Sequence, residues 1–225
     1  MIELAGVRHR FGERTVLDGI DLALAERRIG IVGANGSGKS TLARLFNGLV
    51  VPTSGRVTVD GLDTRRNGAA VRRRVGFVFT DPDAQIVMPT VAEDVAFSLR
   101  RSGLSREEVA GRVAAALDRV GLGGHADHPA HLLSGGQKQL LALTSVLATD
   151  PAVLVCDEPT TLLDARNARR VTALLAELPQ QVVLVTHRLE ELEDFDRVVV
   201  VDEGRVVADD TPAVALKVYA SVIEP

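Results

Sequence analysis

Short runs of apolar residues, most of them rich in valine and isoleucine, recur along the whole chain. They occupy Ile20–Leu24, Ile29–Val32, Val57–Val59, Val75–Phe79, Val153–Cys156, Val182–Val185 and Val198–Val201. Each run has the length of a strand. Several are apolar at every position, which is typical of strands buried on both faces of a parallel sheet. The pattern therefore predicts an α/β protein with a largely parallel sheet.

Helical patterns separate many of these runs. One covers Lys39–Leu49. Thr90 and Ser105 are each followed three residues later by a glutamate, which is the capping box of a helix start. Thr211-Pro212 has the N-cap residue and the first-turn proline of a further helix. Strands that alternate with helices in this way favour an α/β fold over an all-β or all-helical one.

The alternation breaks between residues 81 and 149, where the sequence is mostly helical with loops. We therefore expect a single domain over residues 1–225. Residues 1–80 and 150–225 would form its core, and residues 81–149 would form an inserted helical subdomain.

Composition narrows the possible functions. Hydrophobic residues make up 46% of the chain, which is enough for a packed core. Aromatic residues make up only 3% and the net charge is −4, so we expect no nucleic-acid partner. The single cysteine, Cys156, cannot form an internal disulfide and fits a reducing compartment. No apolar run is long enough to span a bilayer, so any work at a membrane would need another chain.

A glycine-rich loop follows the strand predicted at Ile29–Val32. It reads Gly33-Ala34-Asn35-Gly36-Ser37-Gly38-Lys39-Ser40-Thr41 and matches G-x-x-x-x-G-K-[ST] between a strand and a helix. The glycines let backbone N–H groups turn toward phosphate oxygens at the start of a helix. Lys39 would neutralise the β- and γ-phosphates, and Ser40 would bind Mg²⁺. The loop predicts a nucleoside triphosphate site.

Two acidic residues end the strand predicted at Val153–Cys156. In phosphate-loop enzymes an aspartate at such a strand end holds Mg²⁺, which is the role expected of Asp157. Glu158 points in another direction and can polarise the attacking water. The pair predicts hydrolysis rather than binding alone.

A second glycine-containing helix start lies about a hundred residues after the first. Leu133-Ser134-Gly135-Gly136-Gln137 precedes the apolar periodic segment Leu140–Leu147, with Ser134 as the N-cap. One nucleotide has little use for two phosphate cradles from one chain. Two chains arranged head to tail could each supply one cradle to a shared nucleotide.

These motifs together resemble those of the ATP-binding-cassette ATPases. LSGGQ is similar to their signature, GANGSGKS to their Walker A and VLVCDE to their Walker B. Thr161–Asp164 matches their D-loop, His187 their switch histidine and Phe11 their adenine-stacking aromatic. The resemblance implies a P-loop NTPase with a RecA-like core, an antiparallel β edge subdomain and an inserted helical subdomain. It also implies a homodimer that encloses two ATP molecules head to tail.

The resemblance assigns a role to each matching position. Glu158 would be the general base, and His187 would contact the γ-phosphate. Mg²⁺ would be held by Ser40, Asp157 and Thr80. The nucleotide-binding positions are Phe11, Gly33, Ala34, Asn35, Gly36, Ser37, Gly38, Lys39, Ser40, Thr41, Ser134, Gly135, Gly136, Gln137 and Asp164.

Within this family the chain resembles the energy-coupling-factor branch, because PDAQIVMPTVAEDVAFSL is similar to that branch's segment after the Q-loop. The sequences of the motifs are most similar to those of the ATPases of biotin transporters. Those of the ATPases of cobalt and nickel transporters come next. The resemblance implies a peripheral subunit on the cytoplasmic side of the cell membrane. Its partners would be a transmembrane coupling subunit and a substrate-binding membrane subunit. A different vitamin as substrate, a soluble cassette ATPase and a P-loop kinase stay open as alternatives.

Two positions depart from or extend the family pattern. The family has a glutamine after the strand at Val75–Phe79, where this chain has Thr80. A threonine hydroxyl can bind Mg²⁺ or water but is shorter, so a bridging water would be needed. Gln85 lies five residues too late to replace that glutamine directly, and we expect it to belong to the segment that faces the membrane partner.

The histidines outside these motifs are open to two interpretations. His125, His128 and His131 lie in His-Ala-Asp-His-Pro-Ala-His, which favours a polar surface loop over a metal site because Pro129 breaks helical spacing. His9 lies near Phe11, where we expect a strand residue that faces solvent.

Overall fold

The computed structural model describes residues 1–223, which form two compact units. The core unit comprises Met1–Val75, Ala152–Glu158 and the chain from Leu178 onward. The helical unit comprises Gly76–Pro151 and Pro159–Glu177. Each unit is described by itself below.

An antiparallel sheet forms the first layer of the core unit. Its strands are β1 (Ile2–Phe11), β2 (Arg14–Leu24), β4 (Ser54–Val59) and β5 (Leu62–Asp63), in the order β2-β1-β4-β5. The apolar side chains at the start of β1 are buried, and Ile2 lies opposite both Leu24 and Val59. This sheet is the antiparallel edge that the family resemblance implies.

A second sheet of the core unit carries the phosphate loop. Its strands are β3 (Arg28–Val32), β7 (Val153–Asp157), β8 (Gln181–Val185), β9 (Arg197–Asp202) and β10 (Arg205–Asp210). They are neighbours in the order β10-β9-β3-β8-β7. The pairs that join β3, β7, β8 and β9 are parallel, and only β10 runs antiparallel to β9. Both β3 and β7 are buried at every position, as their unbroken apolar runs predict.

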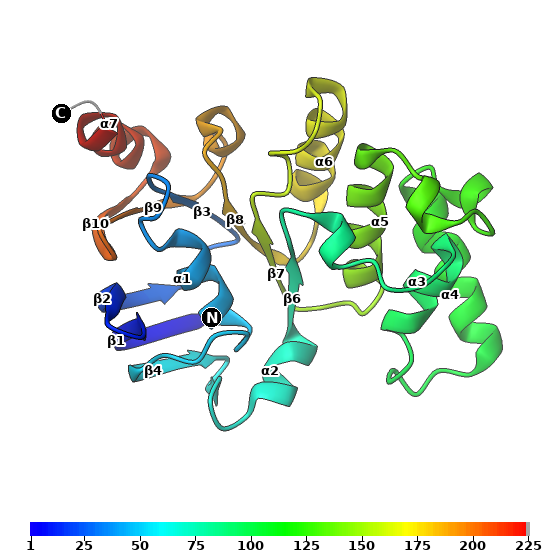
Figure 1. Ribbon diagram of the computed structural model, residues 1–225, viewed down its shortest axis with the longest axis horizontal. Coiled ribbons are helices and arrows are strands. Elements are labelled where there is room, and N and C mark those ends of the chain that lie inside the picture. Colours follow the sequence, from blue (N-terminus) through cyan, green and yellow to red (C-terminus); the bar gives the residue numbers. More distant parts are fainter. Residues whose placement is uncertain (224–225) are drawn as a thin grey trace. The chain divides into compact units, whose positions relative to one another are not determined.

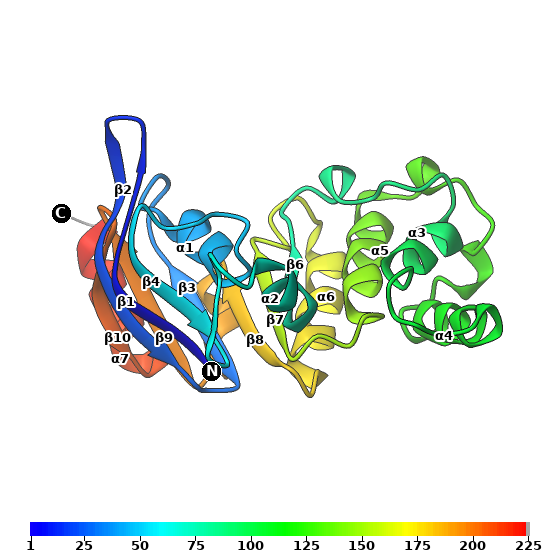
Figure 2. The same cartoon turned by 90° about the horizontal axis from the view of Figure 1, so that it is seen from below.

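Helix α1 (Lys39–Phe46) lies between the two sheets of the core unit, where it contacts β2 and β4 on one side and β7 and β8 on the other (Figure 2). It ends earlier than Leu49, because Asn47 closes it and Gly48 adopts φ 70°. Helix α7 (Pro212–Ile223) begins at the predicted proline and packs on β9 and β10 (Figure 1). The short helix α2 (Gly68–Arg74) leads into β6 (Val75–Val78), the strand at which the helical unit begins.

The helical unit consists mostly of helices and the loops that join them. Its helices are α3 (Val91–Ser98), α4 (Arg106–Arg119), α5 (Gly135–Leu147) and α6 (Ala165–Glu177). Thr90 and Ser105 form complete capping boxes at the starts of α3 and α4. Helix α5 contacts α3, α4 and α6, and these helices lie together in Figure 1. In residues 1–223, no helix combines the length and the apolar character needed to cross a membrane.

A buried carboxylate fastens the helical unit internally. Asp94 on α3 is 4% exposed. It accepts hydrogen bonds from the backbone N–H groups of Val87 and Met88 at 2.9 and 3.2 Å and from the hydroxyl of Ser145 on α5 at 2.8 Å. Because every oxygen is paired, the loop before α3 is held against α5.

Candidate nucleotide site

The phosphate loop has the geometry that its glycines predict. Gly38 is the N-cap of α1 and adopts φ 103°, which an L side chain rarely does. A Cβ on Gly33 would lie 2.3 Å from the carbonyl oxygen of Val201. Both positions therefore need glycine, one for its backbone angle and one for the close approach of β9. The phosphate loop and the N-terminus of α1 together form a cradle for phosphate.

Two polar groups in the cradle lack strong partners within the chain. The hydroxyl of Ser37 is buried with no hydrogen-bond partner among the residues that the structure describes. Lys39 is 5% exposed, and its Nζ lies 3.4 Å from both the Ala34 carbonyl oxygen and Oε1 of Glu158. The buried ammonium of Lys39, whose contacts are long, and the hydroxyl of Ser37 are both suited to bind a phosphate group. The residues present therefore fit a bound triphosphate.

Asp157 and Ser40 meet beside the cradle. Oγ of Ser40 donates to Oδ1 of Asp157 over 2.8 Å, and Nη2 of Arg44 lies 3.4 Å from Oδ2. Asp157 is 1% exposed, and this burial raises the pKa of its carboxyl despite the Ser40 hydrogen bond and the Arg44 charge. Hydroxyl and carboxylate oxygens are the ligands that Mg²⁺ prefers, so this pair fits the ion.

Glu158 lies between the phosphate-loop lysine and the switch histidine. Its Oε1 is 3.4 Å from Nζ of Lys39, and its Oε2 is 3.4 Å from Nδ1 of His187. The backbone of Glu158 adopts φ 52°, an uncommon angle for a residue with a side chain, and its N–H donates to the carbonyl of Val185 over 2.9 Å. Strained backbone of this kind gathers at functional sites, where the fold sets the direction of one side chain.

An open cavity of about 230 Å³ joins Phe11 to the phosphate loop. Its lining includes Phe11, Arg14, Gly36, Lys39 and Thr41. The ring of Phe11 is 57% exposed, which leaves one face free to stack on a base.

The ring of His9 lies edge-on to Phe11, with centroids 4.6 Å apart. His9 is only 8% exposed, so the expectation that it faces solvent is wrong.

The predicted signature motif starts a helix of the helical unit. Ser134 caps α5, and the capping box with Gln137 is complete. Gly136 is required by a close approach, because a Cβ there would lie 2.3 Å from Cγ of Asn167 on α6. The side-chain and backbone amides of Asn167 both donate to the carboxylate of Asp164 at 2.8 Å, and the backbone bond lowers the pKa of that carboxyl. Asn167, which the sequence motifs do not mark, thus connects the signature helix to the D-loop.

The structure brings the predicted residues together in two groups. The core unit holds Phe11, residues 33–41, Asp157, Glu158 and His187. The helical unit holds Thr80, residues 134–137 and Asp164. Arg44, which pairs with Asp157, is a further core residue that the motifs alone do not mark.

Gln85 is turned inward rather than toward a partner. Its Oε1 accepts from the backbone N–H of Phe79 over 3.1 Å, and its Nε2 lies 3.3 Å from the carbonyl of Phe77 and 3.4 Å from that of Ala142. The side chain of Gln85 is therefore bound within the helical unit, and the expectation that its segment faces the membrane partner stays a prediction. Thr80, half-buried, follows the end of β6 in the same unit.

The loop with three histidines brings two of them into contact. Nδ1 of His125 lies 2.8 Å from Nδ1 of His128, whereas His131 is exposed and outside this pair. Within residues 1–223, no group of three or more histidine, cysteine or acidic side chains is arranged to hold a metal ion.

The fold and the site define a P-loop nucleoside triphosphatase. The sequence profile of the family described as "ABC transporter" matches residues 17–161. The chain belongs to the ABC transporter family, as an ATP-binding subunit that hydrolyses ATP to power transport. Proteins of this kind dimerise and act as peripheral partners of membrane subunits.

Relatives with assigned names point to importers. A protein of Deinococcus radiodurans, named as an ABC transporter ATP-binding protein with no substrate, is 56% identical over 97% of both chains. The biotin transport ATP-binding protein BioM of Rhizobium etli is 47% identical over 98% of this chain and 97% of its own. The cobalt import ATP-binding protein CbiO of Syntrophus aciditrophicus is 42% identical over 96% of this chain and 80% of its own.

Solved structures show the same fold. CbiO1 of Clostridium perfringens, part of the ABC transporter complex CbiONQ, has a TM-score of 0.84 at 32% identity and covers 99% of this chain and 92% of its own. A dimeric ATP-binding cassette with ADP and Pi, in a post-hydrolysis state, has a TM-score of 0.83 at 29% identity and covers 94% and 99%.

Proposed function

We propose that this chain is the ATPase subunit of an energy-coupling-factor importer for biotin, held at the cytoplasmic side of the cell membrane by its partners. The contacts of Glu158 with both Lys39 and His187 carry the hydrolytic part of the proposal. The identity with BioM along nearly the whole chain supports biotin as the substrate. The chain would act as one ATP-binding domain, with residues 81–149 as its helical subdomain.

The core unit would bind ATP through groups already in position. The backbone N–H groups of residues 33–41, with Lys39, would hold the phosphates, and Phe11 would stack on the adenine. Ser40 and Asp157 would hold Mg²⁺, which neutralises phosphate charge and orients the triphosphate when bound. Arrival of phosphate would give the Ser37 hydroxyl a partner and Lys39 a closer one than its 3.4 Å contacts.

Glu158 would take a proton from the attacking water. Its carboxylate is aimed by the φ 52° backbone, and its contact with Lys39 places it beside the phosphate position. His187, 3.4 Å from the same carboxylate, would contact the γ-phosphate and hold Glu158 in that direction. A base fixed in this way acts only on a water placed in line with the phosphorus–oxygen bond.

The signature motif would complete the site of a second copy. Ser134, Gly135 and Gly136 lie at the N-terminus of α5, a second cradle for phosphate. A head-to-tail homodimer uses both cradles of each chain, because each ATP then lies between the phosphate loop of one copy and the signature of the other. Asp164 would lie at the same interface, ordered by Asn167. This chain carries every part that both composite sites need.

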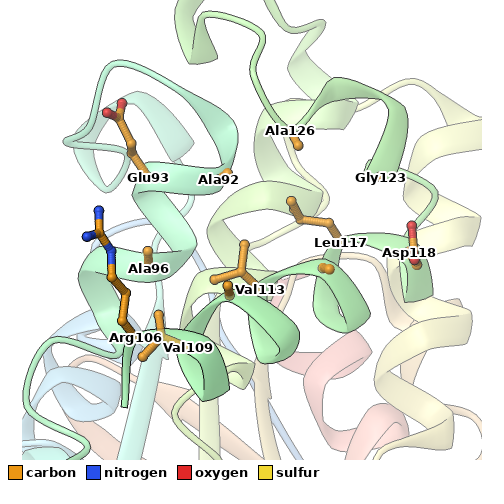
Figure 3. Close-up of a pocket in the computed structure, with 12 residues that line it drawn as sticks. Ala92, Glu93, Ala96, Arg106, Val109, Val113, Leu117, Asp118, Gly123 and Ala126 are labelled. Atoms are coloured by element: carbon orange, nitrogen blue, oxygen red, sulfur yellow. The ribbon is translucent and has the colours of Figure 1, made fainter. Parts of the chain in front are cut away.

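An apolar groove on the helical unit supports a membrane partner (Figure 3). It is a cavity of about 440 Å³ between α3 and α4, floored by small and apolar side chains that include Ala96, Val109 and Val113. Glu93 and Arg106 lie at its side in the close-up, one acidic and one basic. A short amphipathic helix of the coupling subunit would fit such a surface.

Cobalt or nickel ions, or another vitamin, are the second candidates for the substrate, because relatives of this fold include a cobalt importer. The ATPase chemistry would be the same in each case, since the substrate would bind to a separate membrane subunit. A soluble cassette ATPase or a P-loop kinase is less well supported, because neither needs the signature motif together with a membrane-coupling surface.

Uptake by the assembled complex tests the proposal. The chain is coexpressed with its coupling and substrate-binding membrane subunits, and ATP-dependent uptake of labelled biotin into vesicles is measured. We expect uptake with the wild type and a loss of about a hundredfold or more with Glu158→Gln. Uptake of Co²⁺ instead of biotin would show that cobalt is the transported substrate. Failure to copurify with any membrane subunit would contradict the importer role.

A further inference from the structure

A line of hydrogen bonds runs from the signature motif into the loop that precedes it. The backbone N–H of Ser134 donates to Oε1 of Gln137 over 2.9 Å. Nε2 of Gln137 lies 3.3 Å from Nε2 of His125, whose Nδ1 lies 2.8 Å from Nδ1 of His128. The two rings meet edge to face, with centroids 4.8 Å apart. All four residues belong to the helical unit.

This line assigns the proton positions on both rings. Because Oε1 of Gln137 accepts from Ser134, the nitrogen of the same amide must donate. Nε2 of His125 is therefore the acceptor, and the proton of the neutral ring lies on Nδ1. That proton is donated to Nδ1 of His128, whose own proton must lie on Nε2. The hydrogen-bonding pattern thus selects one tautomer for each ring.

We propose that His125, supported by His128, positions the signature glutamine, and that this support exists only while both rings are neutral. A proton on Nε2 of His125 would face the amide N–H of Gln137, and a proton on Nδ1 of His128 would face the N–H of His125. Either event places two donors against each other. The inference rests on the proposed role of Ser134 in the ATP sandwich, since Gln137 holds that residue's backbone.

The backbone of this loop is fixed from outside, so the rings are held in place. The carbonyl of His128 accepts from the N–H of Val91 over 3.2 Å, and that of Ala126 accepts from the N–H of Ala92 over 2.9 Å. Both donors lie in the first turn of α3. A loop tied at two points can hold both rings in place.

The two rings border a small cavity that is mostly apolar. The cavity of about 270 Å³ is lined by the two histidines, Gln137 and three apolar residues, Pro129, Leu132 and Leu133. The loop itself carries Asp127 and His131, and α4 contributes Asp118 near Gly123. On α5 the charged neighbour is Lys138, which pairs with Asp83 at 2.7 Å. Among residues 1–223, the hydrogen bonds of the two rings are those to each other and to Gln137.

The tautomers provide a test that does not depend on ATP hydrolysis. Long-range ¹H–¹⁵N spectra of the ¹⁵N-labelled chain distinguish protonation at Nδ1 from protonation at Nε2. We expect His125 in the Nδ1–H form and His128 in the Nε2–H form at neutral pH, with Gln137→Leu shifting both equilibria together, because the two Nδ1 atoms share one proton. His125 in the Nε2–H form would overturn the proposal. This result stands whether or not the importer role is correct.

Hydrolysis then tests the positioning role. At neutral pH we expect His125→Ala to raise the ATP concentration for half-maximal rate about fivefold, the effect of one lost hydrogen bond. His125→Gln should recover most of this loss, because its amide oxygen can accept from Gln137. A lower pH should weaken ATP binding by the wild type more than by His125→Gln, because the glutamine side chain has no ring nitrogen that can take up a proton.

His131→Gln is the matched control, since His131 lies on the same loop but is exposed and outside the line. It should follow the wild type at every pH, with melting curves confirming that all variants stay folded. Wild-type affinity for ATP in His125→Ala would contradict the proposal. So would an identical pH dependence in His125→Gln and the wild type.

Discussion

Asp157 is a buried side chain that lowers the stability of the folded chain and is suited to bind a cation. Its carboxyl is 1% exposed and its pKa is raised by burial, so the charged form is unfavourable in the folded chain. The hydroxyl of Ser40 and the guanidinium of Arg44 compensate only in part. The cost of burying this carboxylate indicates a binding role. A divalent cation would supply the positive charge that balances it.

We expect Asp157→Asn to stabilise the nucleotide-free chain while abolishing ATP hydrolysis. An acid whose folded-state pKa is raised contributes stability below its unfolded value and loses it as pH rises through the folded value. The advantage of the variant should therefore be larger at pH of about 7 than at about 4, with a gain in melting temperature of about 2 °C at the higher pH. Thermal denaturation of both proteins at the two values measures it. A variant that melts lower than the wild type at neutral pH would contradict this reasoning.

Side-chain direction is the feature that sequence alone predicted least well. His9 faces inward because the register of β1 shifts between Leu4 and Val7, so a simple count of alternating positions gives the wrong face. Gln85 faces inward because carbonyl groups of β6 and α5 need a donor there. Both depend on where other segments lie, which a local pattern cannot contain.

At the scale of elements the prediction was much better, and the reason is physical. Strands such as β3 and β7 are buried on both faces, so their unbroken apolar runs are visible in the sequence. The capping boxes at Thr90 and Ser105 are likewise local, because donor and acceptor lie within one turn. Helix α6 was not predicted, although its buried residues Ala168, Val171 and Leu175 recur at helical spacing.

Helix α5 is bound to the segment after β6 by three polar contacts. The Gln85 amide joins Phe79 to the α5 carbonyl of Ala142, and Nε2 of Gln139 donates to the carbonyl of Phe79 over 3.3 Å. Lys138 pairs with Asp83 at 2.7 Å. Because α5 begins with the signature motif, motion of this segment must move the signature as well.

Gln85→Leu tests this connection. The substitution removes the acceptor of the Phe79 N–H and one donor to each of the Phe77 and Ala142 carbonyl groups, which costs about 1–3 kcal/mol in the free energy of unfolding. We expect the variant complex to keep hydrolysing ATP but to lose transport, since the signature helix no longer follows the segment. Urea unfolding and paired uptake and ATPase assays measure the two effects.

Lys138→Met is the control for Gln85→Leu. It removes an ion pair whose acidic partner is largely exposed, so it should cost about 1 kcal/mol or less. Transport lost in proportion to hydrolysis in Gln85→Leu would show that the segment does not couple the two.

For the whole molecule, the chain carries two half-sites in separate units, each internally complete. In the core unit, Glu158 contacts both Lys39 and His187, and Asp157 accepts a hydrogen bond from Ser40. The helical unit holds the signature and Asp164, connected through Asn167. The motifs were readable from the sequence because each is local, but their supporting contacts join residues far apart in the chain. In the proposed head-to-tail homodimer, the two half-sites act together only across two copies of the chain.

A mixture of two inactive variants tests whether the sites are shared head to tail. Lys39→Ala removes the phosphate loop's cation, and Ser134→Arg blocks the signature, so each homodimer should be inactive. In a head-to-tail heterodimer, one composite site carries both defects and the other carries none. With random pairing, half of the dimers are mixed, so ATPase activity should return to about a quarter of the wild-type value. If each chain instead completed its own site, every site in the mixture would keep one defect, and mixing would restore nothing. Each variant measured alone at the same total concentration is the control.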